Sequence, residues 1–320
     1  MTKHRLVAVT LLAAVLTPLP YLVTDPYLIH LIIMLAMYMM LAVSVDIIYG
    51  YAGQLNLGQA AFAAVGAYIT ALLMLRLQVS YWLAMPLSGA GAAILGLFLG
   101  IPTLRLRGLY LGIATMGFSE IVRLSLLTWT DLTRGPMGLP GIPAPTIGSY
   151  ILESKAAYYY LILMYLIMTL ITIQRLVDSR IGKAWLAIRE DETAALAMGI
   201  NTARYKVLAF TLGAFFAGIA GSFYAVYISF VSPDAFKMMD SYLIFAMPAV
   251  GGMGTTAGPL LGALIIYLLP EVTRAFADYR LLWVGALLVV VMVLQPKGVL
   301  GGLAAITERF HLERRKILIS

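Results

Sequence analysis

The chain has 320 residues, of which 62% are hydrophobic and 12% are charged, with a formal net charge of +7. So large an apolar fraction, gathered in long continuous runs, excludes an ordinary soluble domain and predicts a protein that spans a lipid bilayer. The sequence contains no cysteine, which excludes disulfides, thiol catalysis and cysteine-ligated metal. Because Lys and Arg gather in short loops and near the ends of apolar runs, the positive charge indicates membrane topology and no nucleic-acid partner.

The apolar runs predict membrane-spanning helices. Strands of a membrane barrel alternate over about 10 residues, whereas these runs are continuously apolar. Backbone groups in lipid must also be hydrogen-bonded internally. We therefore expect an all-α polytopic transmembrane helical bundle of about 8–10 spans, built as a single domain over residues 1–320. The expected helices are, in chain order, residues 6–23, 27–48, 57–75, 82–102, 108–128, 157–176, 203–230, a glycine-broken segment over 241–269, and 279–295.

The distribution of Lys and Arg predicts which loops face the cytoplasm. The basic N-terminus, the turn at 105–107, the segment 175–206 and the basic C-terminal tail all fall on that side, so both termini are expected there. The Pro- and Gly-rich linker 129–156 then forms an extracytoplasmic loop. The N-terminal apolar run lacks a small-residue cleavage site, which favours an uncleaved membrane helix over a signal peptide.

Two glycine-rich stretches interrupt the helices. They are YGYAGQLNLGQAAF at 49–62, here the first break, and GGMGTTAGP at 251–259, here the second break. With both termini inside, the segment 241–269 must enter and leave by the same outer face. Paired interrupted helices are typical of a translocation path, but glycines also allow close helix packing, and both interpretations stay open. The candidate path or gate residues in the breaks are Gln54, Asn56, Gly58, Gln59, Gly251, Gly252 and Gly254.

Glu120 is a further path or gate candidate. It follows the Gly108 turn by 12 residues, which places it about 18 Å along the helix. An ionisable group at such depth is costly and is read first as functional. Arg123, however, lies one turn away on the same face and can neutralise it. Glu120 is therefore either half of a structural pair or part of a path or gate.

The stretch SRIGKAWLAIREDETAALAMGIN, residues 179–201, gathers unusual charge for so apolar a chain. Apolar residues recur among the charges at helical spacing, and a loop of this length is long for a simple connector. Its apolar face either packs against the protein's own helices or docks in the groove of another protein. In the second case Arg189, Glu190, Asp191 and Glu192 form the polar rim of the docking helix.

This stretch resembles the coupling loop of permease subunits of ABC importers. Thr193 stands where that loop usually has glutamate before Ala194, Ala195 and Gly199, and Glu192 precedes it. The chain resembles the branched-chain amino-acid permeases of this class, and among them the M-type subunit. The segments that carry the resemblance are GYAGQLNLGQAAFAAVGAYI, LRLRGLYLGIATMGFSEIVR, TRGPMGLPGI, AGIAGSFYA with VSPDAF, GGMGTTAGPLLGA and QPKGVLG.

The resemblance implies a role and partners. Residues 177–202 become a cytoplasmic coupling loop, in which Arg189, Glu190, Asp191, Glu192, Ala194, Ala195 and Gly199 contact an ATPase. The implied partners are a homologous H-type permease, two cytoplasmic ATPases that hold ATP and Mg, and an extracytoplasmic solute-binding protein. The chain itself is then expected to bind no cofactor and to reside in a bacterial or archaeal cell membrane.

Alternative functions remain. The same machinery serves urea or short-chain amides in related permeases, and an ion-coupled secondary transporter would use Glu120 as its coupling carboxylate. The sequence lacks the G-x-x-x-x-G-K-[ST] pattern of a phosphate-binding loop. Its three histidines are scattered and show no metal-ligand spacing. We therefore expect no enzyme activity and no metal site in this chain.

Overall fold

The computed structural model describes residues 25–148 and 150–272, with residues 20, 285–286, 293 and 298–301. Most of the helices expected at 6–23 and 279–295 lies outside these residues, as does most of the basic C-terminal tail. The described part is mostly helical and contains almost no strand, which confirms the prediction of an all-α bundle.

Six described helices are long and apolar enough to cross a membrane, and they confirm six predicted ones to within one turn. The protein is therefore a multi-pass membrane protein. The first of the six, α3, continues through a π turn, η1 (Ile47–Tyr51), before the chain unwinds. The six helices are α3 (Pro26–Asp46), α4 (Gln59–Arg76), α5 (Tyr81–Thr103), α6 (Leu109–Thr128), α8 (Lys155–Asp178) and α11 (Thr202–Ile228).

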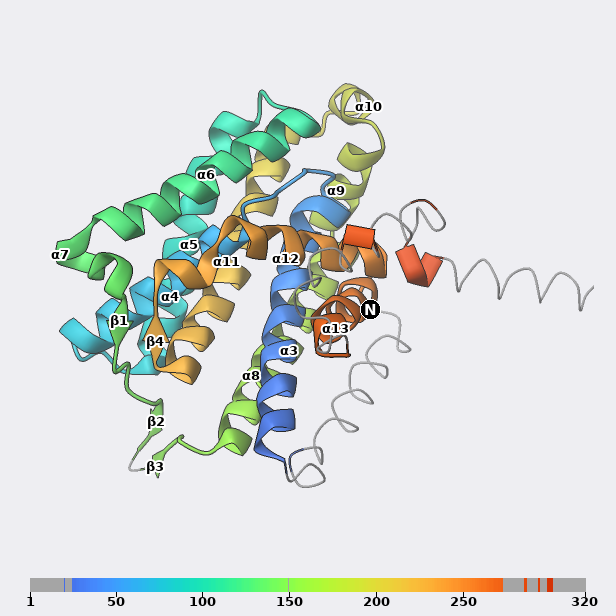
Figure 1. The fold of residues 1–320 in the computed structure, drawn as a ribbon. Helices are drawn as coiled ribbons and strands as arrows, with labels where there is room; N and C mark the ends of the chain where they lie inside the picture. The colour runs from blue at the N-terminus through green and yellow to red at the C-terminus, as the bar shows by residue number, and fades with distance from the viewer. Residues whose placement is uncertain are drawn as a thin grey trace, which may run out of the picture.

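Helix α11 lies at the centre of the bundle and packs mainly on α4 and α5 (Figure 1). Small residues allow this close approach. A side chain on Gly221 would collide with the Ala63 carbonyl of α4, and one on Gly66 would collide with the backbone of Gly218. The aromatic side chains of Phe210 and Phe223 fill the surrounding core.

The linker 129–156 forms compact irregular structure with no long helix. It holds α7 (Thr130–Thr133), a 3₁₀ turn η2 (Gly135–Met137) and the short strands β1 (Leu139–Pro140), β2 (Thr146–Ile147) and β3 (Tyr150–Ile151). Strands β2 and β3 pair with each other. Strand β1 pairs antiparallel with β4 (Phe230–Val231), with Leu139 opposite Val231.

The charged stretch forms two helices, α9 (Arg180–Glu190) and α10 (Glu192–Ala197). Each begins at a polar side chain that accepts backbone N–H groups. Ser179 accepts from Ile181 at 3.1 Å, and Asp191 accepts from Thr193 at 2.7 Å. Figure 1 shows α10 and the β2–β3 hairpin at opposite ends of the bundle.

The glycine-broken segment predicted at 241–269 is observed as two half-helices. A 3₁₀ turn, η3 (Pro233–Phe236), precedes α12 (Met238–Gly251), and α13 (Gly258–Val272) follows the break. The half-helices pack against each other closely, because a side chain on Gly262 would collide with the Met247 carbonyl. Entry and exit by one membrane face stays a prediction.

Candidate coupling and gating site

The two glycine breaks and α9 meet at one point. The Arg189 guanidinium, in the last turn of α9, donates to the carbonyl of Gly50 in the first break. The backbone N–H of Gly254, in the second break, donates to Asp46 Oδ1 at 3.0 Å. Asp46 is buried in the last turn of α3. The side chains of Arg189 and Asp46 thus join three segments that are far apart in the sequence.

Glycine is required where these segments touch. A Cβ atom on Gly254 would lie 2.5 Å from Arg189 Nη1 and 2.8 Å from the Gly50 oxygen, and its φ of +70° already favours glycine. A side chain on Gly50 would collide with the Asp46 carboxylate. On Gly251, one would collide with the Gly258 carbonyl. The glycines of both breaks therefore serve close backbone packing, which is one of the two interpretations left open by the sequence.

The polar residues of the first break satisfy one another. Asn56 Nδ2 donates to Gln59 Oε1 at 2.7 Å, and the Gly58 N–H donates to Asn56 Oδ1 at 3.0 Å. Gln59 Nε2 donates to Ser44 Oγ at 2.8 Å and to the Gly213 carbonyl at 3.1 Å.

These bonds hold the unwound backbone of the first break against α3 and α11. Gln54 is also buried, and its amide lies 3.4 Å from the Ala52 carbonyl. Since the buried amides already have partners in this conformation, a contact between them and a substrate requires the first break to open.

The apolar face of α9 and α10 packs on the protein itself. Trp185 is fully buried, and its Nε1 donates to the Tyr205 carbonyl at 2.8 Å. Ile188 and Ala195 are also buried. This is the internal packing that the sequence left as one alternative for the charged stretch.

The opposite face of α10 is exposed and partly apolar. Leu196 and Met198 project from it, with 82% of Met198 accessible, and Ala194 is exposed beside them. Gly199, with φ of +81°, ends the helix, and the Ile200 N–H returns to the Ala195 carbonyl at 3.0 Å. The segment therefore has one face packed on the protein and one face that is free. The free face can still dock on a partner.

The four expected rim residues have different surroundings. Arg189 reaches Gly50, and Asp191 caps α10. Glu192 forms ion pairs with Lys206 of α11 at 2.5 Å and with Arg107 at 3.3 Å. Glu190 is exposed. Arg107, Glu192 and Lys206 are called the inner charge cluster below.

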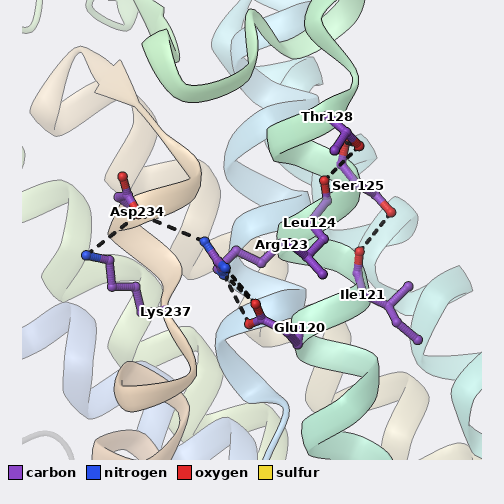
Figure 2. Close-up of polar contacts among 8 residues, drawn as sticks. All are labelled: Glu120, Ile121, Arg123, Leu124, Ser125, Thr128, Asp234 and Lys237. Carbon is purple, nitrogen blue, oxygen red and sulfur yellow. Dashed lines mark hydrogen bonds and ion pairs between the residues drawn. The ribbon is translucent and has the colours of Figure 1, made fainter.

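A second group of charges, the outer charge cluster, consists of Glu120, Arg123, Asp234 and Lys237. Arg123 Nε donates to both Glu120 carboxylate oxygens at 3.0 and 3.1 Å, and Nη2 donates to one of them at 2.6 Å. Arg123 also lies 4.0 Å from Asp234, which lies 3.6 Å from Lys237 (Figure 2). Glu120 therefore has the Arg123 partner that the spacing indicates, and the cluster joins α6 to η3.

Sequence reasoning missed several members of this site. Lys206 is almost completely buried, and its position amid the apolar residues of α11 is the signal that it needs a partner. Leu196 and Met198 could be recognised only once the packed face of α10 was known. In the part of the chain that the structure describes, no group of three or more His, Asp or Glu side chains could hold a metal ion.

Comparison with known proteins assigns the sequence to a family. Residues 27–295 match the family model described as branched-chain amino acid transport system / permease component. The chain belongs to this family. The match includes both breaks, α9, α10 and both charge clusters. No solved structure matches the chain.

Individual relatives are also named as branched-chain amino acid permease proteins. It is 37% identical to the high-affinity branched-chain amino acid transport system permease protein LivM of Escherichia coli, over 82% of this chain and 67% of that protein. It is 25% identical to a probable branched-chain amino acid transport permease protein LivM of Methanocaldococcus jannaschii, over 82% of this chain and 90% of the relative. Identity to the permease protein LivH of Salmonella typhimurium is 26%, over 82% of this chain and 91% of that protein.

Proposed function

We propose that the chain is a membrane-spanning subunit of an ATP-driven ABC importer that translocates branched-chain or related hydrophobic amino acids. The observation that carries the proposal is the 37% identity to a LivM permease protein over most of the chain. The relatives' names supply the amino-acid class. In this assignment ATP and Mg belong to two separate cytoplasmic ATPases, and a solute-binding protein delivers the substrate from outside.

The coupling role is supported by the two faces of α9 and α10. The packed face ties these helices to the bundle through Trp185 and through the Glu192–Lys206 pair. The free face offers Leu196 and Met198 to a partner. A rigid element held on one side and exposed on the other can convert a partner's movement into movement of the bundle. We assign the free face to contact with an ATPase.

The orientation follows from the same assignment. The α9–α10 end then faces the cytoplasm, and the β2–β3 hairpin, at the opposite end in Figure 1, faces outward. The positions of Lys and Arg support this direction. Both termini are accordingly assigned to the cytoplasmic side.

A companion membrane subunit is supported by α6, the least buried of the six long helices. Glu120 and Arg123 are partly exposed on it, and Ile113 is exposed two turns before Glu120 on the same face. Charged side chains at membrane depth are costly against lipid and face protein or water instead. We propose that an H-type permease covers this side of α6 and encloses a central path with it. Glu120 then borders that path while Arg123 neutralises it.

The docking assignment is tested by placing a charge on the free face. We expect Met198→Asp to reduce both the ATPases that copurify and the uptake of branched-chain amino acids by about tenfold or more, as for loss of a buried interface anchor. Met137→Asp is the matched control, because Met137 is 81% exposed but lies in the linker at 129–156. Equal copurification of the ATPases with both variants would refute the docking surface.

A further inference from the structure

Helix α9 contacts the first break through a hydrogen bond from the Arg189 guanidinium as well as through packing. The first break begins within the last turn of η1, where the backbone carbonyls need hydrogen-bond partners outside the helix. The Ile47 and Tyr49 carbonyls receive the N–H groups of Ala52 and Gly53, at 3.2 and 3.1 Å. The Gly50 carbonyl instead receives the Arg189 guanidinium from another helix. A cation at a helix C-terminus is favoured by the helix dipole as well as by the hydrogen bond.

The second break is held at the same place by a buried carboxyl group. The buried Asp46 carboxylate accepts the Gly254 N–H, and Gly254 packs directly on Gly50 and on Arg189. The charge of the Arg189 guanidinium makes its hydrogen bond to Gly50 about twice as strong as a neutral one. The Arg189 stem adds contact, because a Cβ on Gly53 would lie 3.2 Å from its Cα, Cβ and Cγ.

Arg189 is placed to connect a partner with the interior. Much of its residue surface is exposed beside Glu190 at the end of α9, while its guanidinium ends on the buried Gly50. Glu192 of the inner charge cluster follows Arg189 by three residues. A shift of α9 therefore acts on the first break at two points, the Gly50 carbonyl and the backbone of Gly53.

We propose that Arg189 is the positioning residue that transmits movement of α9 to both breaks, acting as a clasp with Asp46, Gly50 and Gly254. In the conformation described here, the clasp holds the breaks together and keeps the polar side chains of the first break paired. Withdrawal of Arg189 frees the Gly50 carbonyl and opens this end of the path. The inference rests on the proposed function for its biological meaning.

The first test measures opening of the first break and needs no substrate. Ala52 is fully buried two residues after Gly50, and the chain has no native cysteine, so an Ala52→Cys variant gives a single labelling position in this subunit. In the purified complex without nucleotide, we expect Arg189→Gln to raise the rate of thiol labelling by about tenfold, the effect of losing one charge-assisted hydrogen bond. Arg189→Lys, which keeps the charge, gives an intermediate rate.

Lys183→Gln is the matched control, because it removes an exposed cation from the same helix. It should leave the labelling rate unchanged. Labelling of the Arg189→Gln protein at the unsubstituted rate, or equal acceleration by Lys183→Gln, overturns the clasp. If the Gln variant does not assemble, the Lys variant carries the same comparison.

The second test separates transmission from simple stability. In vesicles containing the whole importer, we expect Arg189→Gln to retain ATP hydrolysis stimulated by the solute-binding protein but to lower leucine uptake per ATP by about tenfold. A merely destabilised chain loses hydrolysis and uptake in proportion, and that result overturns the transmitting role. Absence of leucine uptake by the unsubstituted complex, with the labelling difference intact, refutes the proposed function and leaves the clasp standing.

Discussion

The inner and outer charge clusters both join segments that are distant in sequence, but the ion pairs Glu192–Lys206 and Arg123–Asp234 differ in their exposure to solvent. In the inner cluster, only 3% of the Lys206 side chain is accessible, and Glu192 approaches it at 2.5 Å. In the outer cluster, 59% of Asp234 and of Lys237 is accessible, and the distances between different segments lengthen to 4.0 Å. Burial makes the loss of one partner costly, whereas water and salt screen an exposed pair. The inner cluster therefore contributes strongly to holding α10 on α11, while the charges of the outer cluster contribute little to holding η3 on α6.

The largest effect is expected when the inner pair loses its anion. Glu192→Ala leaves the Lys206 ammonium buried without its carboxylate, and we expect a loss of about 3 kcal/mol in the free energy of unfolding. Thermal and denaturant unfolding of the purified protein measures it. Adding Lys206→Met should recover most of the loss, because the unpaired charge is then gone. A Glu192→Ala protein as stable as the parent protein would contradict the larger stabilisation that we assign to the buried Glu192–Lys206 pair.

An intermediate effect is expected within the outer cluster at its most buried pair. Glu120→Ala removes three hydrogen bonds from Arg123 and leaves it only the distant Asp234. We expect a loss of about 1–2 kcal/mol, measured in the same unfolding experiment. Glu120→Gln retains a hydrogen-bond acceptor and should lose less. A larger effect than that of Glu192→Ala reverses the proposed order.

A small effect is expected at the exposed end of the outer cluster. Asp234→Asn breaks the contacts with Arg123 and Lys237, which are long and solvent-accessible. The expected loss is about 0.5 kcal/mol or less. A loss comparable with that of Glu120→Ala would mean that η3 is held by this charge, contrary to the comparison.

The smallest effect concerns salt. The Debye length falls from about 30 Å at 0.01 M to about 3 Å at 1 M ionic strength. We expect the coupling between Arg123 and Asp234 in a double-mutant cycle to disappear over this range. The coupling between Glu192 and Lys206 should persist. Equal salt sensitivity of both couplings would show that the inner cluster is as accessible as the outer one.

Local pattern predicts much of this molecule. The six spans follow from continuous apolar runs, the breaks from their glycines, and the Glu120–Arg123 pair from spacing along one helix face. The charged stretch was correctly expected to be helical, but its division at Asp191 depends on an extended backbone there, with φ of −153°.

The remaining features depend on contacts between distant segments. Glu192 meets Lys206 and Arg107 only after α10 has packed on α11 and on the turn between α5 and α6. Arg189 meets Gly50 only after α9 has packed on η1. In the sequence alone, the charges of Arg189 and Glu192 are equally consistent with a solvent-exposed polar rim. For the same reason, the sequence could propose path residues in the first break but could not show that Asn56 and Gln59 bond to each other.

The pairing of β1 with β4 has a consequence for biosynthesis. Pro140 lies opposite Phe230, 90 residues later, and Val231 is completely buried in the pair. At a synthesis rate of about 5–20 residues per second, the β1 segment waits about 5–20 s for its partner. During that interval α8, α9, α10 and α11 are all made. The β1 end of the linker at 129–156 can therefore pair with β4 only after α11 has been synthesised, so this contact forms late, after most of the bundle has been made.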